Sequence, residues 1–512
     1  MIGKVGTYGG CLFGNNYIAG EWIAGEWGNQ RNELVSMNPA TTMLVVGYVP
    51  IATRHELDTA IQAANDAFKV WGDNTKWSWV KRAEVIDELV QLVKSSTDEI
   101  AKLMARECGK VFNECVADVV EGIHMLQYCA GMGRQPIGYK ISSEIVEKDA
   151  ETYLAPRGVC TVITPWNFPF AIPTWLIGPA LVSGNTVIFK PSEETPLTAQ
   201  YLVELWDIAA KKHNVPKGVL NLVHGRGEEG EYLVRHEGTV GQLFTGSYEV
   251  GANIKKIAAD HYDKFAVCEM GGKNSLIVLA DADLELAVNC AVLGAYKTTH
   301  QRCVSSDLII VEEAIEPEFT GRFIEITKRI KFGDPFDPRS FAGPLINQDA
   351  VYKHYSNVLR ASKDAGQSLL AGISGYCPGY FVMPSVFRMK HRPGTFALRE
   401  EFFTPVVVIV PVKDLEEALY VANDHEYGLS MALMTNDYRK MREFKVRGKA
   451  GLKYVNLPTI GAEVHLPFGG MRRSGTGMPS AAWLFKNMCH ETAFTVNYGR
   501  EIKMAQGLSA DI

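Results

Sequence analysis

Residues 298–306 read Thr298-Thr299-His300-Gln301-Arg302-Cys303-Val304-Ser305-Ser306, and residues 268–274 read Cys268-Glu269-Met270-Gly271-Gly272-Lys273-Asn274. The first segment carries a thiol and the second a carboxylate, each in a polar or glycine-rich turn beside an apolar run. We interpret Cys303 as a nucleophile and Glu269 as a general base, because covalent catalysis needs both. A lone cysteine is more often an inert buried thiol, and a lone glutamate a surface residue, so the interpretation depends on their occurring together.

Size and composition limit what the chain can be. At 512 residues it is too long for one simple core, which predicts two or more domains. Its 46% hydrophobic and 21% charged residues are typical of a globular protein, and a formal charge of −6 gives no basic face for nucleic acid. No apolar stretch reaches the roughly 20 residues of a membrane-spanning helix. Residues 1–16 also lack the features of a secretory signal.

The cysteines and histidines are scattered along the chain. The ten cysteines form no CxxC pair, and a disulfide framework is not expected at this length. The thiols fit a reducing compartment, so we expect a cytoplasmic protein. We expect no metal site, because the histidines are dispersed and His490-Glu491-Thr492-Ala493-Phe494 lacks the second histidine of a zinc-binding helix.

Helical and strand patterns alternate, which predicts an α/β fold with mostly parallel strands. Apolar residues recur at helical spacing over 57–71 and 80–93. Thr195-Pro196 predicts the capped start of a further helix, which carries apolar residues as far as Ala210. The doublet of Ile-Ala-Gly-Glu-Trp at 18–27 predicts a hairpin. Strands are expected at 160–163, 186–189, 219–223, 240–244, 275–279, 308–311 and 406–410.

A third segment, Trp166-Asn167-Phe168-Pro169, precedes the other two. Asn167 can supply the amide N–H that a tetrahedral oxyanion needs. Together the three segments resemble the NAD(P)-dependent aldehyde dehydrogenase superfamily, over about residues 17–499, and more loosely its semialdehyde dehydrogenases. Two later segments also look like signatures of that family, Asn423-Asp424-x-x-Tyr427-Gly428-Leu429 and Pro467-Phe468-Gly469-Gly470-x-x-x-Ser474-Gly475.

The resemblance implies oxidation of an aldehyde to a carboxylic acid. Cys303 attacks the carbonyl carbon, while Asn167 and the backbone N–H of Cys303 stabilise the oxyanion. Loss of hydride to the nicotinamide leaves a thioester, and Glu269 activates the water that releases the acid.

A glycine turn predicts the coenzyme side. Gly246-Ser247-x-x-x-Gly251 follows a strand and opens a helix, whose free N–H groups and dipole suit a pyrophosphate. Glycines at such turns are often only tight turns, and the segment is not G-x-G-x-x-G. The resemblance implies that Gly246, Ser247 and Gly251 line the phosphates, and that other residues complete the NAD site: Trp166, Lys190, Ser192, Glu193, Glu401 and Phe403. The carboxylate of Glu193 would repel a 2′-phosphate, which favours NAD, with NADP left open.

The aldehyde side is less defined. The resemblance places Phe168 and Phe468 at the aldehyde tunnel and the loop Ile460-Gly461-Ala462-Glu463-Val464-His465-Leu466 beside it. The carboxylate of a semialdehyde needs a cationic anchor, for which Arg302 and His465 are candidates.

The resemblance also implies three regions. Residues 1–136 and 156–268 form a Rossmann-type coenzyme domain, and residues 269–485 an α/β catalytic domain. Residues 137–155 and 486–512 form a small bridging β-element. Pairing of its edge between subunits predicts a homodimer or homotetramer.

Several residues depart from the family pattern. His300 stands where glycine is usual, either as a proton acceptor for the thiol or as a larger loop residue. Leu176 and His490 stand where many members have a lysine and a glutamate, and Thr404 replaces a glycine. Gly477-Met478-Pro479 replaces Gly-Arg-Glu. Two alternative functions stay open: a CoA-acylating semialdehyde dehydrogenase, against which Glu269 argues, and a non-catalytic protein with the same fold.

Overall fold

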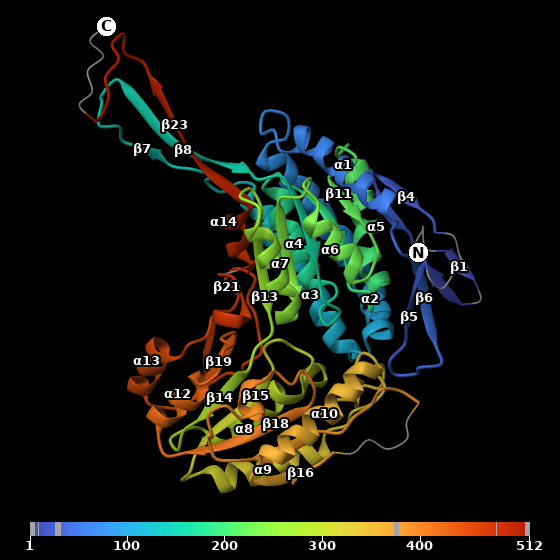
Figure 1. The fold of residues 1–512 in the computed structure, drawn as a ribbon, viewed down its shortest axis with the longest axis vertical. Coiled ribbons are helices and arrows are strands. Elements are labelled where there is room, and N and C mark those ends of the chain that lie inside the picture. The colour runs from blue at the N-terminus through green and yellow to red at the C-terminus, as the bar shows by residue number, and fades with distance from the viewer. Residues whose placement is uncertain (1–5, 9, 26–31, 373–377, 478, 507–512) are drawn as a thin grey trace.

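The alternation of helices and strands builds two seven-stranded sheets, with a narrow arm projecting from the body (Figure 1). The computed structural model describes residues 6–8, 10–25, 32–372, 378–477 and 479–506. The expected α/β class with mostly parallel strands is confirmed.

The first sheet has the strand order of a doubly wound dinucleotide-binding fold. Five parallel strands run in the order β13-β12-β9-β10-β11, so the chain reverses direction across the sheet between β9 and β12. In such sheets ligands bind beyond the carboxyl ends of the strands at this switch point. The expected hairpin of β3 and β4 adds two antiparallel strands. The strands are β13 (Phe265–Met270), β12 (Gly241–Gly246), β9 (Val159–Ile163), β10 (Thr186–Lys190), β11 (Leu220–Leu222), β3 (Asn16–Ile18) and β4 (Glu21–Ile23).

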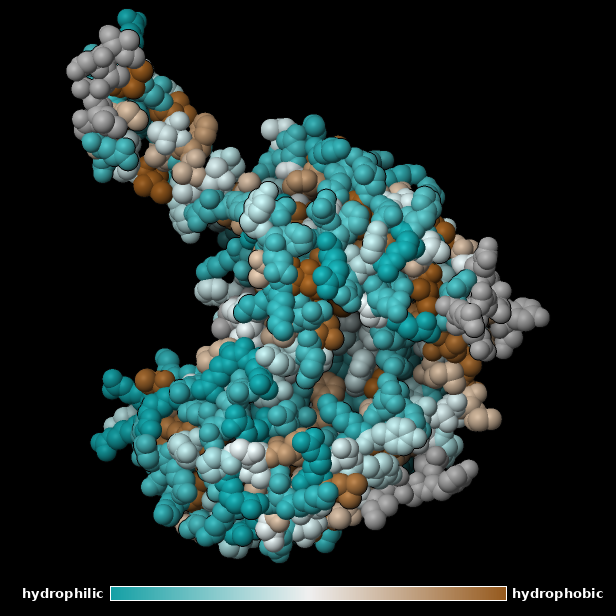
Figure 2. Space-filling view, in the orientation of Figure 1, coloured by the Kyte–Doolittle hydropathy of each residue, from teal (hydrophilic) through white to brown (hydrophobic). Residues whose placement is uncertain are grey.

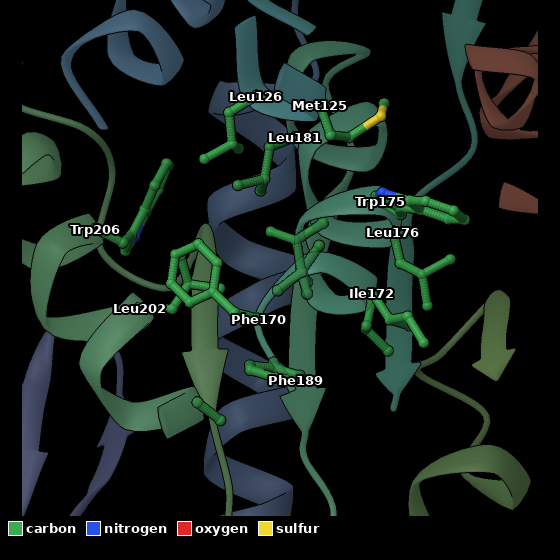
Figure 3. Close-up of a cluster of buried hydrophobic side chains, with 14 of the residues drawn as sticks. Met125, Leu126, Phe170, Ile172, Trp175, Leu176, Leu181, Phe189, Leu202 and Trp206 are labelled. Atoms are coloured by element: carbon green, nitrogen blue, oxygen red, sulfur yellow. The ribbon is translucent and has the colours of Figure 1, made fainter. Parts of the chain in front are cut away.

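Helices cover this sheet because their apolar stripes match its buried strands. Side chains from α3, α4, β10 and α5 interlock in the largest core cluster, shown in Figure 3. The helix expected from residue 80 is longer than its pattern, extending to Cys108. The helices of this part are α1 (Arg54–Trp71), α2 (Trp79–Cys108), α3 (Phe112–Met132), α4 (Ala171–Val182), α5 (Pro196–Lys212), α6 (Gly227–Arg235) and α7 (Tyr248–Ala259).

Helix α5 starts as predicted, with Thr195 at the N-cap position and Pro196 in the first turn. The Thr195 side chain makes no capping hydrogen bond. Instead, the buried carboxylate of Glu107 accepts from the backbone N–H groups of Leu197 and Thr198, at 3.0 and 2.6 Å. A distant residue therefore fills the role that was assigned to the local one.

The second sheet carries the other half of the site. Its strands are parallel except for β16, in the order β16-β17-β18-β15-β14-β19-β20. They are β16 (Gln367–Leu370), β17 (Ser385–Arg388), β18 (Val406–Val412), β15 (Ser306–Glu312), β14 (Asn274–Val278), β19 (Ser430–Met434) and β20 (Leu452–Val455). The helices around it are α8 (Leu284–Tyr296), α9 (Glu316–Arg329), α10 (Gln348–Asp364), α11 (Phe396–Arg399), α12 (Leu415–Asn423) and α13 (Tyr438–Arg447), with a short turn η1 (Lys297–His300) after α8.

The arm is a three-stranded antiparallel sheet in the order β23-β8-β7. Its strands are β7 (Lys140–Ile141), β8 (Lys148–Pro156) and β23 (Cys489–Asn497). Figure 2 shows hydrophobic side chains on the arm, and Tyr139, Ile141 and Val146 are exposed.

Smaller elements complete the fold. A four-stranded sheet contains β1 (Gly6–Tyr8), β2 (Cys11–Phe13), β6 (Val45–Pro50) and β5 (Glu33–Met37). Between the second sheet and the arm lie β21 (Pro467–Phe468), η2 (Arg472–Ser474), β22 (Ser480–Ala481), η3 (Ala482–Leu484) and α14 (Phe485–Met488). Strand β13 crosses the predicted boundary between residues 268 and 269, and the domain boundaries stay a prediction. Within the described ranges, no helix has both the length and the apolar character needed to cross a membrane.

Candidate active site

The thiol follows a turn in which three consecutive non-glycine residues have left-handed backbone. Thr298, Thr299 and His300 have φ angles of 52°, 56° and 66°. This conformation disfavours each residue by roughly 1–2 kcal/mol, because Cβ approaches the following carbonyl oxygen, and β-branched threonine tolerates it least. Contacts from elsewhere in the fold must therefore hold the turn.

Side chains of the turn make those contacts. Thr299 Oγ1 donates to the carbonyl of Gly343 at 2.8 Å. His300 Nδ1 lies 2.6 Å from the carbonyl oxygen of Ala295, and His300 Nε2 lies 2.8 Å from Asp307 Oδ1. Both ring nitrogens are therefore engaged away from the thiol. Of the two readings of His300, the geometry favours the larger loop residue over the proton acceptor.

Asp307 also reaches the segment that follows Glu269. Its Oδ2 lies 3.7 Å from Nζ of Lys273, which sits 3.4 Å from the ring centre of Phe402. Burial lowers the pKa of Lys273 to about 8, against the opposing effect of Asp307. We call these three residues, His300, Asp307 and Lys273, the Asp307 network. The network links the segment that carries Cys303 to the segment that carries Glu269.

Glu269 lies on strand β13, one residue before its end, and so in the strand instead of the expected turn. Its side chain is buried, and Oε1 has no hydrogen-bond partner in the described part of the chain. Burial, with a smaller contribution from Glu401, raises the pKa of Glu269 well above its ordinary value. A buried carboxylate with a free oxygen and a raised pKa binds a proton more readily than an exposed glutamate does, which suits a general base.

Glu401 approaches the same strand end. Its carboxylate accepts from the backbone N–H of Gly272 at 3.0 Å. A Cβ on Gly271 would come within 2.2 Å of this carboxylate, so only glycine permits the approach. Burial raises the pKa of Glu401 to about 7.

Two asparagines fix the backbone around the thiol. Asn274 Nδ2 donates to the carbonyls of Cys303 and Ser305, at 2.7 and 2.9 Å. Asn167 Nδ2 donates to the carbonyl of Gln301 at 2.9 Å, which orients the amide beside the same loop. Burial, and then Glu269, raise the pKa of the Cys303 thiol well above its ordinary value. The thiol therefore needs a base before it can attack.

Cys303 and Glu269 line two adjoining cavities. One has a volume of about 340 Å³ and also includes Asn167, Trp166, Glu401 and Phe403. The structure therefore brings the predicted nucleophile, base and oxyanion amide to one space. The other cavity, of about 60 Å³, lies on the side of Phe168, Arg302 and Phe468.

The larger cavity continues into a cleft of about 780 Å³ at the switch point of the first sheet. Trp166, Gly246 and Ser247 line both spaces. Of the predicted coenzyme residues, Lys190, Ser192 and Glu193 also line the cleft, whereas Glu401 and Phe403 line the cavity beside the thiol. The long hollow has the size and shape of a dinucleotide site.

Gly251 has a different role from the one expected. Among the described residues it is not part of the cleft wall, because it is buried inside α7 against strand β13. A Cβ there would lie 2.5 Å from Met270 Sδ. Gly251 therefore permits close packing of helix on strand, whereas Ser247 caps the helix by accepting from the Val250 N–H.

The predicted aldehyde-side residues divide into two groups. The Phe168 ring lies 3.8 Å from Lys110 Nζ and 5.0 Å from Arg302 Cζ, and Phe468 packs edge-on to Trp175. His465 lies outside this group: its side chain is 59% exposed, 3.1 Å from Glu463, and is not among the described residues that line the cavities.

Comparison with known proteins identifies this arrangement. A family model described as "Aldehyde dehydrogenase family" matches residues 27–494. The chain belongs to the aldehyde dehydrogenase family. It is therefore an oxidoreductase with the fold of that family, as the three sequence segments predict.

Individual aldehyde dehydrogenases are similar over nearly the whole chain. An alpha-ketoglutaric semialdehyde dehydrogenase of Bacillus subtilis is 35% identical, covering 90% of this chain and 93% of its own. A D-glyceraldehyde dehydrogenase (NADP(+)) of Picrophilus torridus is 36% identical over 86% and 88% of the two chains. The structure of a Thermus 1-pyrroline-5-carboxylate dehydrogenase with bound NAD superposes with a TM-score of 0.87, at 31% identity, covering 95% of this chain and 93% of that one.

Sequence reasoning missed three acidic residues on α3, namely Glu114, Asp118 and Glu121. Their spacing places them along one face of the helix, within an otherwise apolar pattern. Asp118 pairs with Lys110 at 2.7 Å and accepts from the N–H of Ala171, which starts α4. Glu121 lines the 60 Å³ cavity, and burial, with a smaller effect of Asp118, raises its pKa to about 8. Carboxylates at helical spacing among buried residues were the signal that could have revealed them.

The departures from the aldehyde dehydrogenase pattern are accommodated locally. Leu176 belongs to the buried cluster of Figure 3. Thr404 Oγ1 accepts from Asn357 Nδ2 at 3.0 Å, and the left-handed residue is its neighbour Phe403, with φ of 55°. His490 is exposed on β23, paired with Ala155. Met478 lies outside the described residues.

Proposed function

We propose that this protein oxidises an aldehyde of the semialdehyde class to its carboxylic acid with NAD, through a thioester on Cys303. The observation that carries the proposal is that Cys303 and Glu269 line both the aldehyde-side cavity and the cavity that opens into the dinucleotide cleft. A thiol, a carboxyl and a hydride acceptor can then meet at one carbon.

The residues divide the reaction between them. Glu269 takes the thiol proton, directly or through water, and the Cys303 sulfur bonds to the carbonyl carbon. The oriented Asn167 amide donates to the resulting oxyanion. NAD, when bound, accepts the hydride that leaves this carbon. After releasing the first proton to solvent, Glu269 removes a proton from water, whose oxygen bonds to the thioester carbon as the carbon–sulfur bond breaks, and it then returns that proton to the Cys303 thiolate. The net change consumes one aldehyde, one NAD⁺ and one water, and yields one acid, one NADH and one proton.

NAD is the proposed coenzyme because of the charged side chains that line the cleft. Lys190 is buried with Nζ 2.9 Å from the carbonyl of Pro191 and 3.9 Å from Glu193 Oε2. Glu193, Glu228 and Glu231 line the same cleft and would repel a 2′-phosphate. The Picrophilus relative is named for NADP(+), so coenzyme preference is part of the test.

A semialdehyde is the proposed substrate class because Arg302 lines the aldehyde-side cavity and several relatives are named for semialdehydes. The guanidinium offers a bidentate contact to a carboxylate. Release by water is favoured over transfer to CoA because Glu269 is buried beside the thiol.

We propose that the arm joins subunits in a homodimer or homotetramer. Its exposed apolar residues and unpaired strand edges would be covered by a second copy. The nine free cysteines in the described ranges fit the expected cytoplasmic location.

The test is NADH formation with a panel of aldehydes and semialdehydes, without CoA, with the acid product identified. Cys303→Ser should lower kcat/KM by at least about 10³-fold. The matched control is Cys11→Ser, since Cys11 and Cys303 are the two half-buried cysteines of the described chain. NAD binding without turnover of any aldehyde would favour a non-catalytic protein, and a strict need for CoA would favour the acylating alternative.

A further inference from the structure

We propose that Glu114, on helix α3, is a positioning residue that holds the Cys303 loop and the Arg302 guanidinium in one arrangement. The proposal rests on the proposed function in that it takes Cys303 as the nucleophile.

Glu114 lies at the contact between two distant parts of the chain. It is in the first turn of α3, and its side chain is 9% exposed. The carboxylate accepts from the backbone N–H of Thr298 at 3.4 Å and from the Thr298 hydroxyl. It also lies 3.3 Å from Arg302 Nη2 and 3.4 Å from Lys297 Nζ. One buried group therefore binds three residues of the segment that leads to Cys303.

The segment needs such a restraint because its backbone is strained. Thr298 begins the left-handed turn, and its hydroxyl also accepts from Arg302 Nε at 2.8 Å. A β-branched residue keeps a positive φ only when its surroundings hold it there. The contacts of Thr299 and His300 restrain the later part of the turn. Glu114 restrains the beginning and connects it to Arg302.

Arg302 connects Glu114 to the reacting thiol. It precedes Cys303, lines the same cavity, and lies over the Phe168 ring. Its positive charge favours the thiolate, whereas several groups around the thiol oppose it. The charged or titratable groups that face Cys303 are Arg302, Glu269, Glu401, Glu121 and Tyr454. If Arg302 were no longer held beside Cys303, its charge would no longer stabilise the thiolate against the nearby carboxyls, and the pKa of the thiol would rise.

The carboxylate is suited to this role over a wide pH range. Burial alone would raise the pKa of Glu114, but Arg302 and Lys297 together hold it below the ordinary value. The Glu114 carboxylate therefore stays ionised at neutral pH.

The experiment compares Glu114→Gln, Glu114→Asp and Glu316→Gln in the full-length protein. Glu316 is a matched control because it too is a buried helix carboxylate that accepts from an arginine, Arg388, at 2.9 Å and a threonine, Thr320, at 2.7 Å, with both partners outside the cavities. The readouts are kcat, KM for aldehyde, NAD binding, and the pH dependence of Cys303 alkylation by iodoacetamide.

Glu114→Gln should lower kcat by about tenfold or more while NAD affinity is unchanged. Its alkylation curve should move to higher pH. Glu114→Asp, which keeps the charge, should recover part of both effects, and Glu316→Gln should lower thermal stability only. The proposal is overturned if the alkylation curve of Glu114→Gln superimposes on that of the wild type, or if Glu316→Gln changes it equally.

A second pair of variants covers the case in which Glu114→Gln does not fold. Thr298→Val removes the hydroxyl without adding charge, and Thr298→Ser retains it. The valine variant should show the same alkaline shift and the serine variant should not; equal curves would overturn the proposal. Failure of the proposed function is recognised separately, because wild-type turnover would then survive full alkylation of Cys303.

Discussion

The two reacting side chains are held in opposite ways. Glu269 lies on strand β13, in register with β12, where backbone hydrogen bonds to a regular neighbour fix its place. Cys303 follows a left-handed turn that has no such ladder and is held by side chains from α3 and β15 and by the backbone carbonyl of Gly343. The base therefore gains its position from local regularity, and the nucleophile from tertiary contacts. A substitution of Glu269 on the strand should therefore lower activity with little loss of stability, whereas a substitution in the turn before Cys303 should also lower stability.

The largest expected effect is on the strand side. Glu269→Gln removes the base but leaves the backbone ladder intact, so kcat should fall by about 10²–10³-fold. Because Glu269 is the base for thiol attack as well as for hydrolysis, both steps should slow, and no burst of NADH should precede the steady rate. Rapid-mixing absorbance tests for a burst, and calorimetry should give an unchanged or higher Tm, because the cost of burying an ionised carboxylate is removed. A marked loss of Tm would contradict the inference that the backbone ladder of β13, and not the Glu269 side chain, holds this part of the fold.

In the turn before Cys303, the substitution His300→Gly compares the cost of the left-handed backbone with the gain from the side-chain contacts of His300. Glycine removes the backbone strain at φ of 66°, yet the change also deletes the contacts to Ala295 and Asp307. We expect net destabilisation by about 1–3 kcal/mol, because Asp307 loses a buried partner. Denaturant unfolding of the wild type and variant measures it. Thr299→Gly, which loses one hydrogen bond at a similar φ, should be affected less. A more stable His300→Gly protein would mean that strain outweighs the Asp307 network.

The smallest effect concerns Glu401, beside the end of β13. Its pKa is raised by burial from 4.5 to about 7 in the folded protein. The protonated form therefore stabilises the fold most below about pH 4.5, and this contribution is lost as the pH rises through about 7. Glu401→Gln should remove about 1–2 kcal/mol of the decrease in stability between pH 5 and pH 8. Thermal unfolding across this range measures the slope, with the exposed Glu400→Gln as control. Parallel slopes in all three proteins would contradict the assigned shift.

The same contrast explains what the sequence could and could not predict. Several parallel strands of both sheets were predictable because buried parallel strands are short apolar runs, but β13, which carries Glu269, was not among them. The family segments singled out Cys303, Glu269 and Asn167. Glu107 as the cap of α5, Gly251 as a packing residue and His465 on the surface were not predictable, because each depends on which distant element arrives nearby. The acidic face of α3 was visible as spacing, but its purpose appears only when the turn at Thr298 is placed against it.

Helix α3 sets the distances between three parts of this site. Glu114, Asp118 and Glu121 contact the thiol loop, the start of α4 and the aldehyde cavity in turn. Because each helical residue advances about 1.5 Å and rotates about 100°, the three separations are set by residue count alone. Inserting or deleting one residue between positions 114 and 121 would swing the later carboxylates out of reach. This stretch should therefore accept exchanges of side chain far more readily than any change of length.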